Sequence, residues 1–156
     1  MRSHPDIEAL VDALREGVID AIVTDHAPHD IVSKETTFEA AASGISVFET
    51  VFGSLMGLVH AGKLSLAQLV ERLTVAPSRI LGEHFADLAI LKPGTPADLV
   101  LFDPDREWTV DVDQFVSKGK NTPLDGATLK GVVMATIFSG EIVYHDGPVG
   151  LEAPDG

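Results

Sequence analysis

The segment that decides the fold runs from Val18 to Asp30 and reads Val-Ile-Asp-Ala-Ile-Val-Thr-Asp-His-Ala-Pro-His-Asp. Its first part, residues 18–24, is short, largely apolar and rich in β-branched side chains, which predicts a buried parallel strand. Asp25, His26 and His29 follow this strand directly. In α/β folds the C-terminal ends of strands carry the active site. The segment therefore predicts an α/β protein with a polar site at the end of this strand.

Apolar residues at helical spacing lie on both sides of the predicted strand. A helix is expected over Ser3–Glu16, with Ser3 as its N-cap and Gly17 as the residue that ends it. Further helices are expected over residues 47–61, after Ser65, and over residues 76–82. A helix, a glycine turn and a buried strand in succession are typical of α/β proteins.

The pattern changes from helical to strand-like near residue 83. Strands are expected over residues 97–102, 107–110, 128–138 and 141–144, with a hairpin turn at Ser139-Gly140. The chain thus divides into an α/β part, residues 1–82, and a small β part, residues 83–147. Residues 148–156 are expected to form a frayed tail.

Composition excludes several classes of function. The 156 residues include 24 Asp and Glu but 11 Lys and Arg, a net charge of −13, which argues against nucleic acid or an anionic membrane as partner. No apolar run is long enough to span a membrane, and the first residues lack the apolar core of a signal peptide. The absence of cysteine excludes disulfides and thiolate chemistry. We expect a cytoplasmic protein of about one domain's length.

The strongest candidates for catalysis or metal binding are Asp25, His26 and His29. A carboxylate at a strand end can bind a metal ion and transfer protons, and Pro28 stiffens the turn that projects His29. The alternative is an ordinary loop with two solvated histidines. The residue types and their spacing leave these two interpretations evenly balanced.

The full sequence of motifs favours the first interpretation. Residues 24–29 (Thr-Asp-His-Ala-Pro-His) resemble the strand-eight motif of class I dihydroorotases of the amidohydrolase superfamily. The resemblance continues in the family's order through nearly the whole chain, at residues 38–39, 44–45, 49–50, 62–65, 76–82, 94–100, 117–123 and 129–131. It implies the C-terminal part of a (β/α)8 barrel, with residues 83–147 contributing to a small composite β-sandwich.

The resemblance also implies roles for individual residues. Asp25 would be a metal ligand and the general acid/base, moving a proton between the metal site and the ring nitrogen as N-carbamoyl-aspartate and dihydroorotate interconvert. His29 would donate a hydrogen bond to the substrate carboxylate, and the backbone at Ser43 and Gly44 would contact the ring. The family usually has Pro-Phe before this glycine, where the chain has Ala42-Ser43. His26 has no implied role and is interpreted as structural.

The resemblance implies one or two zinc ions, but the chain lacks the other metal ligands. The family's His-x-His pair, its modified lysine and two further histidines have no counterpart among His4, His60, His84 and His145. A (β/α)8 barrel also takes about 250 residues. We therefore expect this chain to be the C-terminal part of a larger enzyme and to be inactive alone.

Two alternatives remain open, a non-catalytic scaffold for aspartate transcarbamoylase and another cyclic amidohydrolase such as a hydantoinase or allantoinase. A homodimer is also compatible with the sequence.

Overall fold

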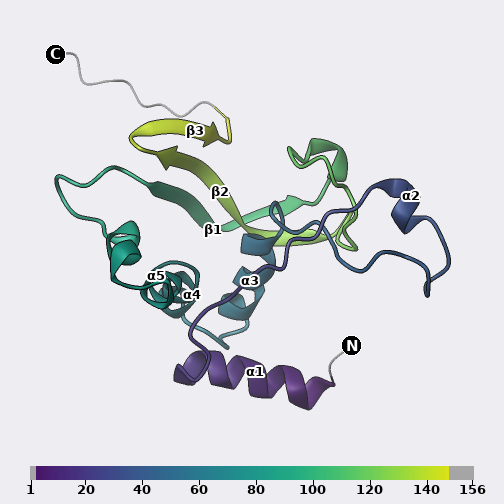
Figure 1. The fold of residues 1–156 in the computed structure, drawn as a ribbon, viewed down its shortest axis with the longest axis horizontal. Coiled ribbons are helices and arrows are strands. Elements are labelled where there is room, and N and C mark those ends of the chain that lie inside the picture. Colours follow the sequence, from purple (N-terminus) through teal and green to yellow (C-terminus); the bar gives the residue numbers. More distant parts are fainter. Residues whose placement is uncertain (1–2, 148–156) are drawn as a thin grey trace.

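The computed structural model describes residues 3–147, apart from the side chains of residues 86 and 87. Helices come first in the chain and a small antiparallel sheet comes last (Figure 1). The helical elements are α1 (His4–Glu16), α2 (Ile31–Lys34), α3 (Val51–His60), α4 (Leu66–Leu73), α5 (Val75–Leu81), η1 (Glu83–Ala89) and η2 (Val112–Gln114). The strands are β1 (Leu99–Thr109), β2 (Thr128–Phe138) and β3 (Glu141–His145).

Helix α1 begins and ends where its sequence predicts. Ser3 and Asp6 form a capping box, in which the Ser3 hydroxyl accepts from the Asp6 amide and the Asp6 carboxylate accepts from the Ser3 amide. The Ser3 hydroxyl also donates to the Asp6 carboxylate at 2.7 Å, and the hydrogen bonds that this carboxylate accepts from the Ser3 hydroxyl and amide lower the pKa of Asp6. Gly17 closes the helix in the left-handed conformation, with φ of 79°. The first turn of α1 is therefore satisfied by its own residues.

The predicted strand over residues 18–24 is not a strand in this structure, which corrects the sequence analysis. The segment runs past α3 toward α2 without a neighbouring strand (Figure 1). The amides of Val18 and Ile19 donate to the carbonyl of Ala13 at the end of α1, and further along the amide of Ile22 donates to the carbonyl of Arg72 in α4 at 3.1 Å. A parallel strand requires partners on its edges, and no described segment of the chain supplies one.

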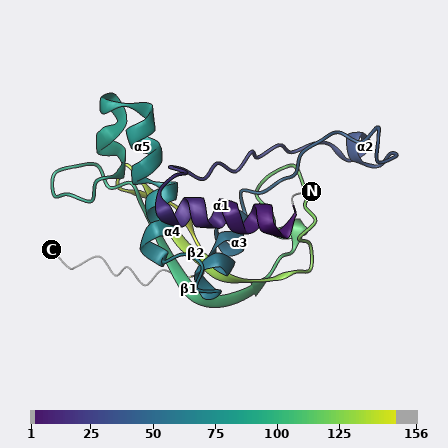
Figure 2. The same cartoon turned by 90° about the horizontal axis from the view of Figure 1, so that it is seen from below.

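Helices α1 and α4 are joined through the end of α1. The Arg72 guanidinium donates to the carbonyl of Leu14 at 3.2 Å, and the Gln68 amide donates to the carbonyl of Arg15 at 3.1 Å. These carbonyls belong to the last turn of α1, where no intrahelical partner is available. In Figure 2, which views the molecule from below, α1 and α4 lie in front of the sheet.

The sheet has the order β1-β2-β3, with both pairs antiparallel. Strand β2 and the hairpin turn at Ser139-Gly140 match the sequence analysis, and both turn residues have positive φ, 51° and 85°. The two strands expected over residues 97–102 and 107–110 are instead one strand, β1, interrupted by an irregularity after Asp103. The Asp103 carboxylate accepts from the amides of Asp105 and Arg106, which allows the chain to bulge and continue.

Helix α3 packs on strand β2 and contributes to the core. Met56 is fully buried, and the indole nitrogen of Trp108 donates to the carbonyl of Gly131 at 3.2 Å. Helix α3 begins at Val51 rather than at residue 47, because a tight turn in which the Thr50 amide donates to the Val47 carbonyl comes first. The sequence analysis placed this start four residues too early.

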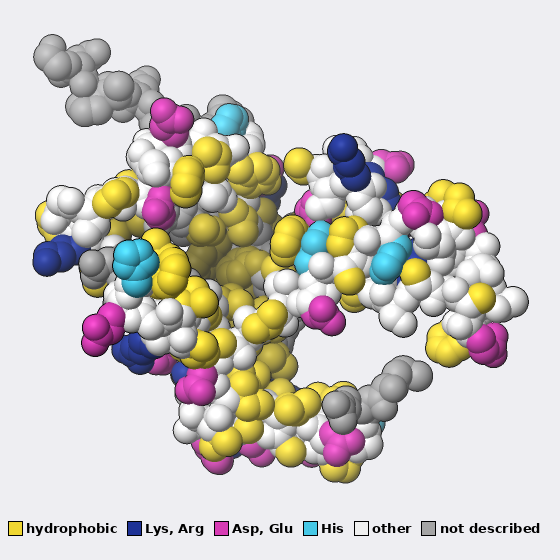
Figure 3. Space-filling view, in the orientation of Figure 1, with side chains coloured by type: hydrophobic (Ala, Val, Ile, Leu, Met, Phe, Trp, Pro, Cys, Tyr) yellow, Lys and Arg dark blue, Asp and Glu magenta, His cyan; other side chains and the backbone are white. Residues whose placement is uncertain are grey.

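Much of the apolar surface of the described chain is uncovered. Eight apolar residues are buried, whereas 22 large apolar residues are exposed, among them Val23 (84%) and Phe38 (94%). Figure 3 shows a hollow between the sheet, the helices and the loop around α2, with hydrophobic side chains on its floor. Such an extent of exposed apolar surface is typical of a surface that packs against further protein. No helix within residues 3–147 is long and apolar enough to cross a membrane.

Candidate active site

Asp25 is the first residue of the loop that contains the predicted site. Its side chain is exposed, and its backbone adopts a left-handed conformation with φ of 48°. Asp and Asn tolerate this conformation better than most non-glycine residues. The conformation turns the chain sharply where the apolar segment ends, and it leaves the carboxylate accessible.

His29 is held at both its backbone and its ring. Its amide donates to Oδ1 of Asn121 at 3.0 Å, and its Nε2 lies 2.7 Å from the carbonyl oxygen of Ser43. A carbonyl can only accept, so Nε2 carries the proton and, in the neutral ring, Nδ1 is an acceptor. A second donated hydrogen bond, such as one to a substrate carboxylate, therefore requires the imidazolium form of His29.

Ser43 and Gly44 lie directly against the loop that contains His29. The amide of Ala27 donates to the carbonyl of Ile45 at 3.0 Å, and a Cβ at Gly44 would be 2.5 Å from the Cβ of Ala27 and 3.2 Å from Nε2 of His29. The structure thus brings together His29, Ser43 and Gly44, as the sequence analysis expects of a common site. Contact between these residues and a ring stays a prediction.

Lys34 and Asp30 shape the loop between these two segments. The Lys34 ammonium donates to the carbonyls of Ala42 and Gly44, at 2.8 and 3.1 Å. Asp30 caps α2, and hydrogen bonds from the backbone and hydroxyl of Ser33 lower its pKa. The carbonyl of Gly44 is therefore already occupied by a protein donor.

His26 has contacts that fit the structural role expected for it. Its Nδ1 accepts from the amides of Val47 and Phe48, at 3.1 and 3.3 Å. Its ring stacks on Phe48, with ring centroids 3.6 Å apart and planes 5° from parallel. His26 thereby joins the Asp25 loop to the turn before α3.

Glu49 is a partly buried carboxylate beside this loop. Its Oε1 accepts from the amide of Ser117 at 2.8 Å, while its Oε2 is buried with no hydrogen-bond partner among the described residues. Burial by itself raises the pKa of Glu49, but hydrogen bonds from Ser117, helped by the charge of His26, outweigh burial and leave the pKa below its usual 4.5.

The lowered pKa of Glu49 predicts a pH-dependent contribution to stability. This contribution is present above pH 4.5 and is lost as the pH falls through the lower pKa of the folded state. The difference in free energy of unfolding between the unmodified chain and Glu49→Gln should therefore shrink as the pH falls from 6 to about 3. Urea unfolding across this range measures it. Glu35→Gln, a change at an exposed carboxylate, serves as control, and a constant difference for Glu49→Gln would contradict the prediction.

The described residues do not form a complete metal site. No group of three His, Asp or Glu side chains that could hold a metal ion occurs among residues 3–147. His60 and His145 contact the carbonyls of Pro104 and Gly147, and the His84 ring meets Phe85 edge-on. These histidines lie apart from Asp25 in the sequence and make packing contacts, in line with the sequence analysis.

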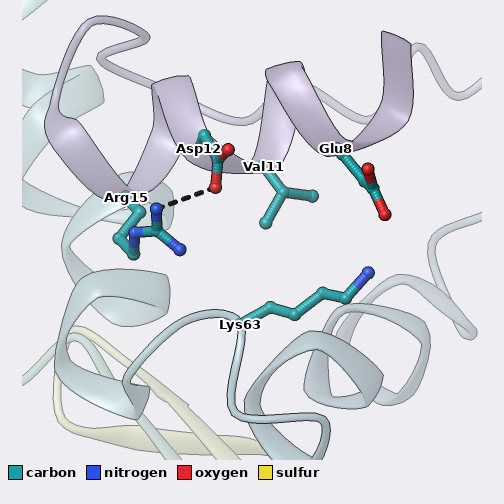
Figure 4. Close-up of a pocket in the computed structure, with 5 residues that line it drawn as sticks. All are labelled: Glu8, Val11, Asp12, Arg15 and Lys63. Carbon is teal, nitrogen blue, oxygen red and sulfur yellow. Dashed lines mark ion pairs between the residues drawn. The ribbon is translucent and has the colours of Figure 1, made fainter. Parts of the chain in front are cut away.

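A pocket of about 210 Å³ lies elsewhere, between α1 and the loop before α4 (Figure 4). Glu8, Val11, Asp12, Arg15 and Lys63 line it, and Arg15 pairs with Asp12 at 2.8 Å. Its lining contains none of the predicted site residues. Because its charges are mixed and largely solvated, this pocket has no evident chemical role.

Asn121 is the residue that the sequence analysis missed. It lies within residues 117–123, which that analysis used only as part of the resemblance. The structure places its side chain between the loop of His29 and the loop of Gly44, with a hydrogen bond to each. The only signal in the sequence is the segment Lys-Gly-Lys-Asn-Thr-Pro itself, which has no local pattern that indicates a contact with residue 29.

Comparisons with known proteins agree on one family. The sequence profile of the amidohydrolase family matches residues 1–143. The dihydroorotases of Syntrophus aciditrophicus and Thermoanaerobacter sp. are 44% and 47% identical over 146 and 145 residues, covering 94% and 92% of this chain. The chain spans about a third of the length of these relatives, 34% and 33%. The structure of L-hydantoinase (dihydropyrimidinase) from Arthrobacter aurescens superimposes with a TM-score of 0.83 at 31% identity, covering 95% of this chain and 34% of that one.

Proposed function

The chain belongs to the amidohydrolase family, and from this premise we propose that it is part of a dihydroorotase. The reaction would be the reversible closure of N-carbamoyl-aspartate to dihydroorotate. The observation that supports it best is a single loop that carries the exposed Asp25 and holds the ring of His29 against Ser43 and Gly44. This arrangement occurs in a chain whose relatives include dihydroorotases at 44% and 47% identity.

The proposed roles follow from the groups that these residues present. Ring closure joins the nitrogen of the carbamoyl group to a carboxyl carbon and releases water, so the nitrogen must lose a proton. The accessible carboxylate of Asp25 would accept this proton and pass it to the departing carboxyl oxygen, which takes a second proton from solvent and leaves as water. In the hydrolytic direction Asp25 would return the proton to the ring nitrogen. His29, in its imidazolium form, would donate from Nδ1 to the second carboxylate of the substrate while Nε2 stays on Ser43.

Residues 3–147 of this chain do not fit a whole zinc site. Asp25 could supply one oxygen ligand, but zinc sites in proteins use three or four protein ligands. One or two zinc ions, as the resemblance implies, would therefore depend on ligands from other residues of the enzyme.

The uncovered surfaces of the chain support its place in a larger barrel. Residues 18–24 pair with no strand among the described residues. Large apolar side chains are exposed on the helices and on the sheet. We propose that residues 1–82 complete such a barrel as its last strand and helices. Residues 83–147 would join a composite β-sandwich, whereas the proposed tail, residues 148–156, lies outside the described residues.

Reassembly from two pieces tests this proposal. We expect the 156-residue chain alone to give no turnover of N-carbamoyl-aspartate above a zinc-only blank. Adding the part of the Syntrophus aciditrophicus dihydroorotase that this chain does not match should restore turnover, because it supplies the missing strands and ligands. That part alone serves as control, and dihydroorotate formation is followed directly. Turnover by the chain alone, or a stable complex without turnover, would contradict the proposal.

A second substrate class is favoured by one observation. The likeness to the L-hydantoinase structure, at 31% identity, supports a cyclic amidohydrolase that opens hydantoins instead. The reassembled pair should therefore be offered hydantoin and dihydroorotate in parallel. Preference for dihydroorotate is expected, and preference for hydantoin would reassign the substrate.

The proposed partners can be tested with the same pair. Loss of the metal ligands from the rest of the enzyme would favour the scaffold alternative, in which the protein assembles with aspartate transcarbamoylase. Analytical ultracentrifugation with and without aspartate transcarbamoylase distinguishes a free homodimer from such an assembly. A cytoplasmic location stays a prediction.

A further inference from the structure

The side chain of Asn121 bridges two loops that are far from it in the sequence. Its Oδ1 accepts from the amide of His29 at 3.0 Å, and its Nδ2 donates to the carbonyl of Gly44 at 3.2 Å. Its own carbonyl accepts from the amide of Ser46 at 2.9 Å. One residue of the segment after η2 therefore holds both loops of the candidate site.

The bridge needs the amide group of asparagine. The His29 amide can only donate and the Gly44 carbonyl can only accept, so the orientation of the Asn121 side chain is fixed by its partners. Aspartate would keep the acceptor for His29 but would place a second acceptor against the carbonyl of Gly44. Alanine would lose both contacts and would leave the His29 amide without a partner in a partly buried place, while the Gly44 carbonyl would keep only the Lys34 ammonium.

The neighbouring Gly119 allows the segment to come this close. A Cβ at Gly119 would be 2.4 Å from the Cβ of Pro28, the residue directly before His29. The segment that contains Gly119 and Asn121 thus packs against the loop at Pro28 and hydrogen-bonds it at His29. The packing of Gly119 on Pro28 and the hydrogen bond from the His29 amide to Asn121 both restrain the backbone at His29.

We propose that Asn121 is a positioning residue for His29. It fixes the backbone of His29 directly, and it fixes the loop of Ser43 and Gly44, whose carbonyl at Ser43 binds Nε2 of the ring. Asn121 thereby keeps Nε2 of His29 donating to the Ser43 carbonyl, in the neutral ring and in the imidazolium form alike, so that Nδ1 is the nitrogen left for the substrate. The proposal rests on the proposed role of His29, but the geometry it describes is measured without any activity.

Nuclear magnetic resonance of the chain itself provides the test. Long-range ¹H–¹⁵N correlations report which nitrogen of His29 carries the proton, and hydrogen exchange reports the protection of the His29 amide. Asn121 is the only asparagine in the sequence, so labelling with ¹⁵N-asparagine isolates its side-chain amide. In the unmodified chain we expect an Nε2-protonated ring, a protected His29 amide and a slowly exchanging Asn121 side-chain amide.

Asn121→Ala should loosen the loop of His29 and weaken the hold on the loop of Gly44, whose carbonyl keeps the Lys34 ammonium. The His29 amide should exchange about tenfold faster, and the ring should become a mixture of the two neutral forms. Lys118→Ala, a change at an exposed residue of the same segment, should change neither. If Asn121→Ala unfolds the chain, Asn121→Asp decides the matter, because it should retain protection of the His29 amide and still lose the single ring form. An unchanged ring form in a folded variant, or an equal change in Lys118→Ala, would overturn the proposal.

The outcome is separate from that of the proposed function. A ring form that depends on Asn121, together with no turnover in the reassembled pair, would retain Asn121 as a positioning residue and reject the dihydroorotase activity. In an active pair, Asn121→Ala should raise KM for N-carbamoyl-aspartate at least as much as it lowers kcat, because His29 is proposed to bind the substrate carboxylate. A fall in kcat with unchanged KM would contradict positioning through His29.

Discussion

Asp25→Asn should lower kcat of the reassembled pair by about 10³-fold, which is the usual contribution of a general acid/base. Asparagine keeps the size of the side chain and tolerates the positive φ of 48° at this position. The substitution therefore removes the proton acceptor while leaving the turn intact. The measurement is steady-state cyclisation of N-carbamoyl-aspartate by the pair.

Asp30→Asn is the matched control for this variant. Asp30 lies on the same loop, but its carboxylate caps α2 by accepting from the amide and hydroxyl of Ser33, both at 2.8 Å. Asparagine also caps helices well, so kcat should stay unchanged. A similar loss in both variants would show that the loop depends on its negative charge as a whole and would contradict a specific role for Asp25.

Gly44→Ala should destabilise the chain by about 3 kcal/mol. The φ of 125° at Gly44 strains any residue with a side chain, and the new Cβ would lie 2.5 Å from the Cβ of Ala27 and 2.8 Å from its carbonyl oxygen. Because that oxygen belongs to the backbone, it cannot rotate away, and the two loops must separate. Urea unfolding followed by the fluorescence of Trp108, the single tryptophan, measures the loss.

Gly62→Ala separates backbone strain from crowding. Gly62 also has a positive φ, 68°, but a Cβ there would meet nothing within 4 Å. Its substitution should cost about 1 kcal/mol, the usual cost of a left-handed backbone for a residue with a side chain. Hydrogen exchange of the Ala27 amide, which donates to Ile45, detects separation that stays local to the two loops. Equal unfolding energies for the two variants, with Ala27 still protected, would contradict the close packing at Gly44.

The elements predicted correctly are those whose signals are local. Helix α1 carries its cap and its closing glycine within its own sequence, and β2 with its hairpin turn shows the β-branched pattern and turn residues of an antiparallel pair. The strand expected over residues 18–24 failed because a parallel strand depends on neighbours that are distant in sequence. The apolar pattern of residues 18–24 is typical of a strand buried between two neighbours, and the described part of the chain supplies no such neighbours.

The candidate site divides in the same way. The proximity of His29 to Ser43 and Gly44 could be predicted because the resemblance assigns them to one site. The bridge from Asn121 could not, because it joins backbone groups 92 and 77 residues away. Every residue carries a backbone carbonyl and nearly every residue an amide, so no residue type at position 29 or 44 indicates which side chain will bind them.

The capping box of α1 also has a use in protein engineering. Because the amide of Asp6 is satisfied by Ser3 and the amide of Ser3 by Asp6, this helix begins without help from residues before Ser3. If a barrel is divided just before such a helix, the first turn of the helix stays capped by its own residues. Fusing two interacting proteins to the two pieces would then make enzyme turnover a reporter of their association, with this junction as the split point.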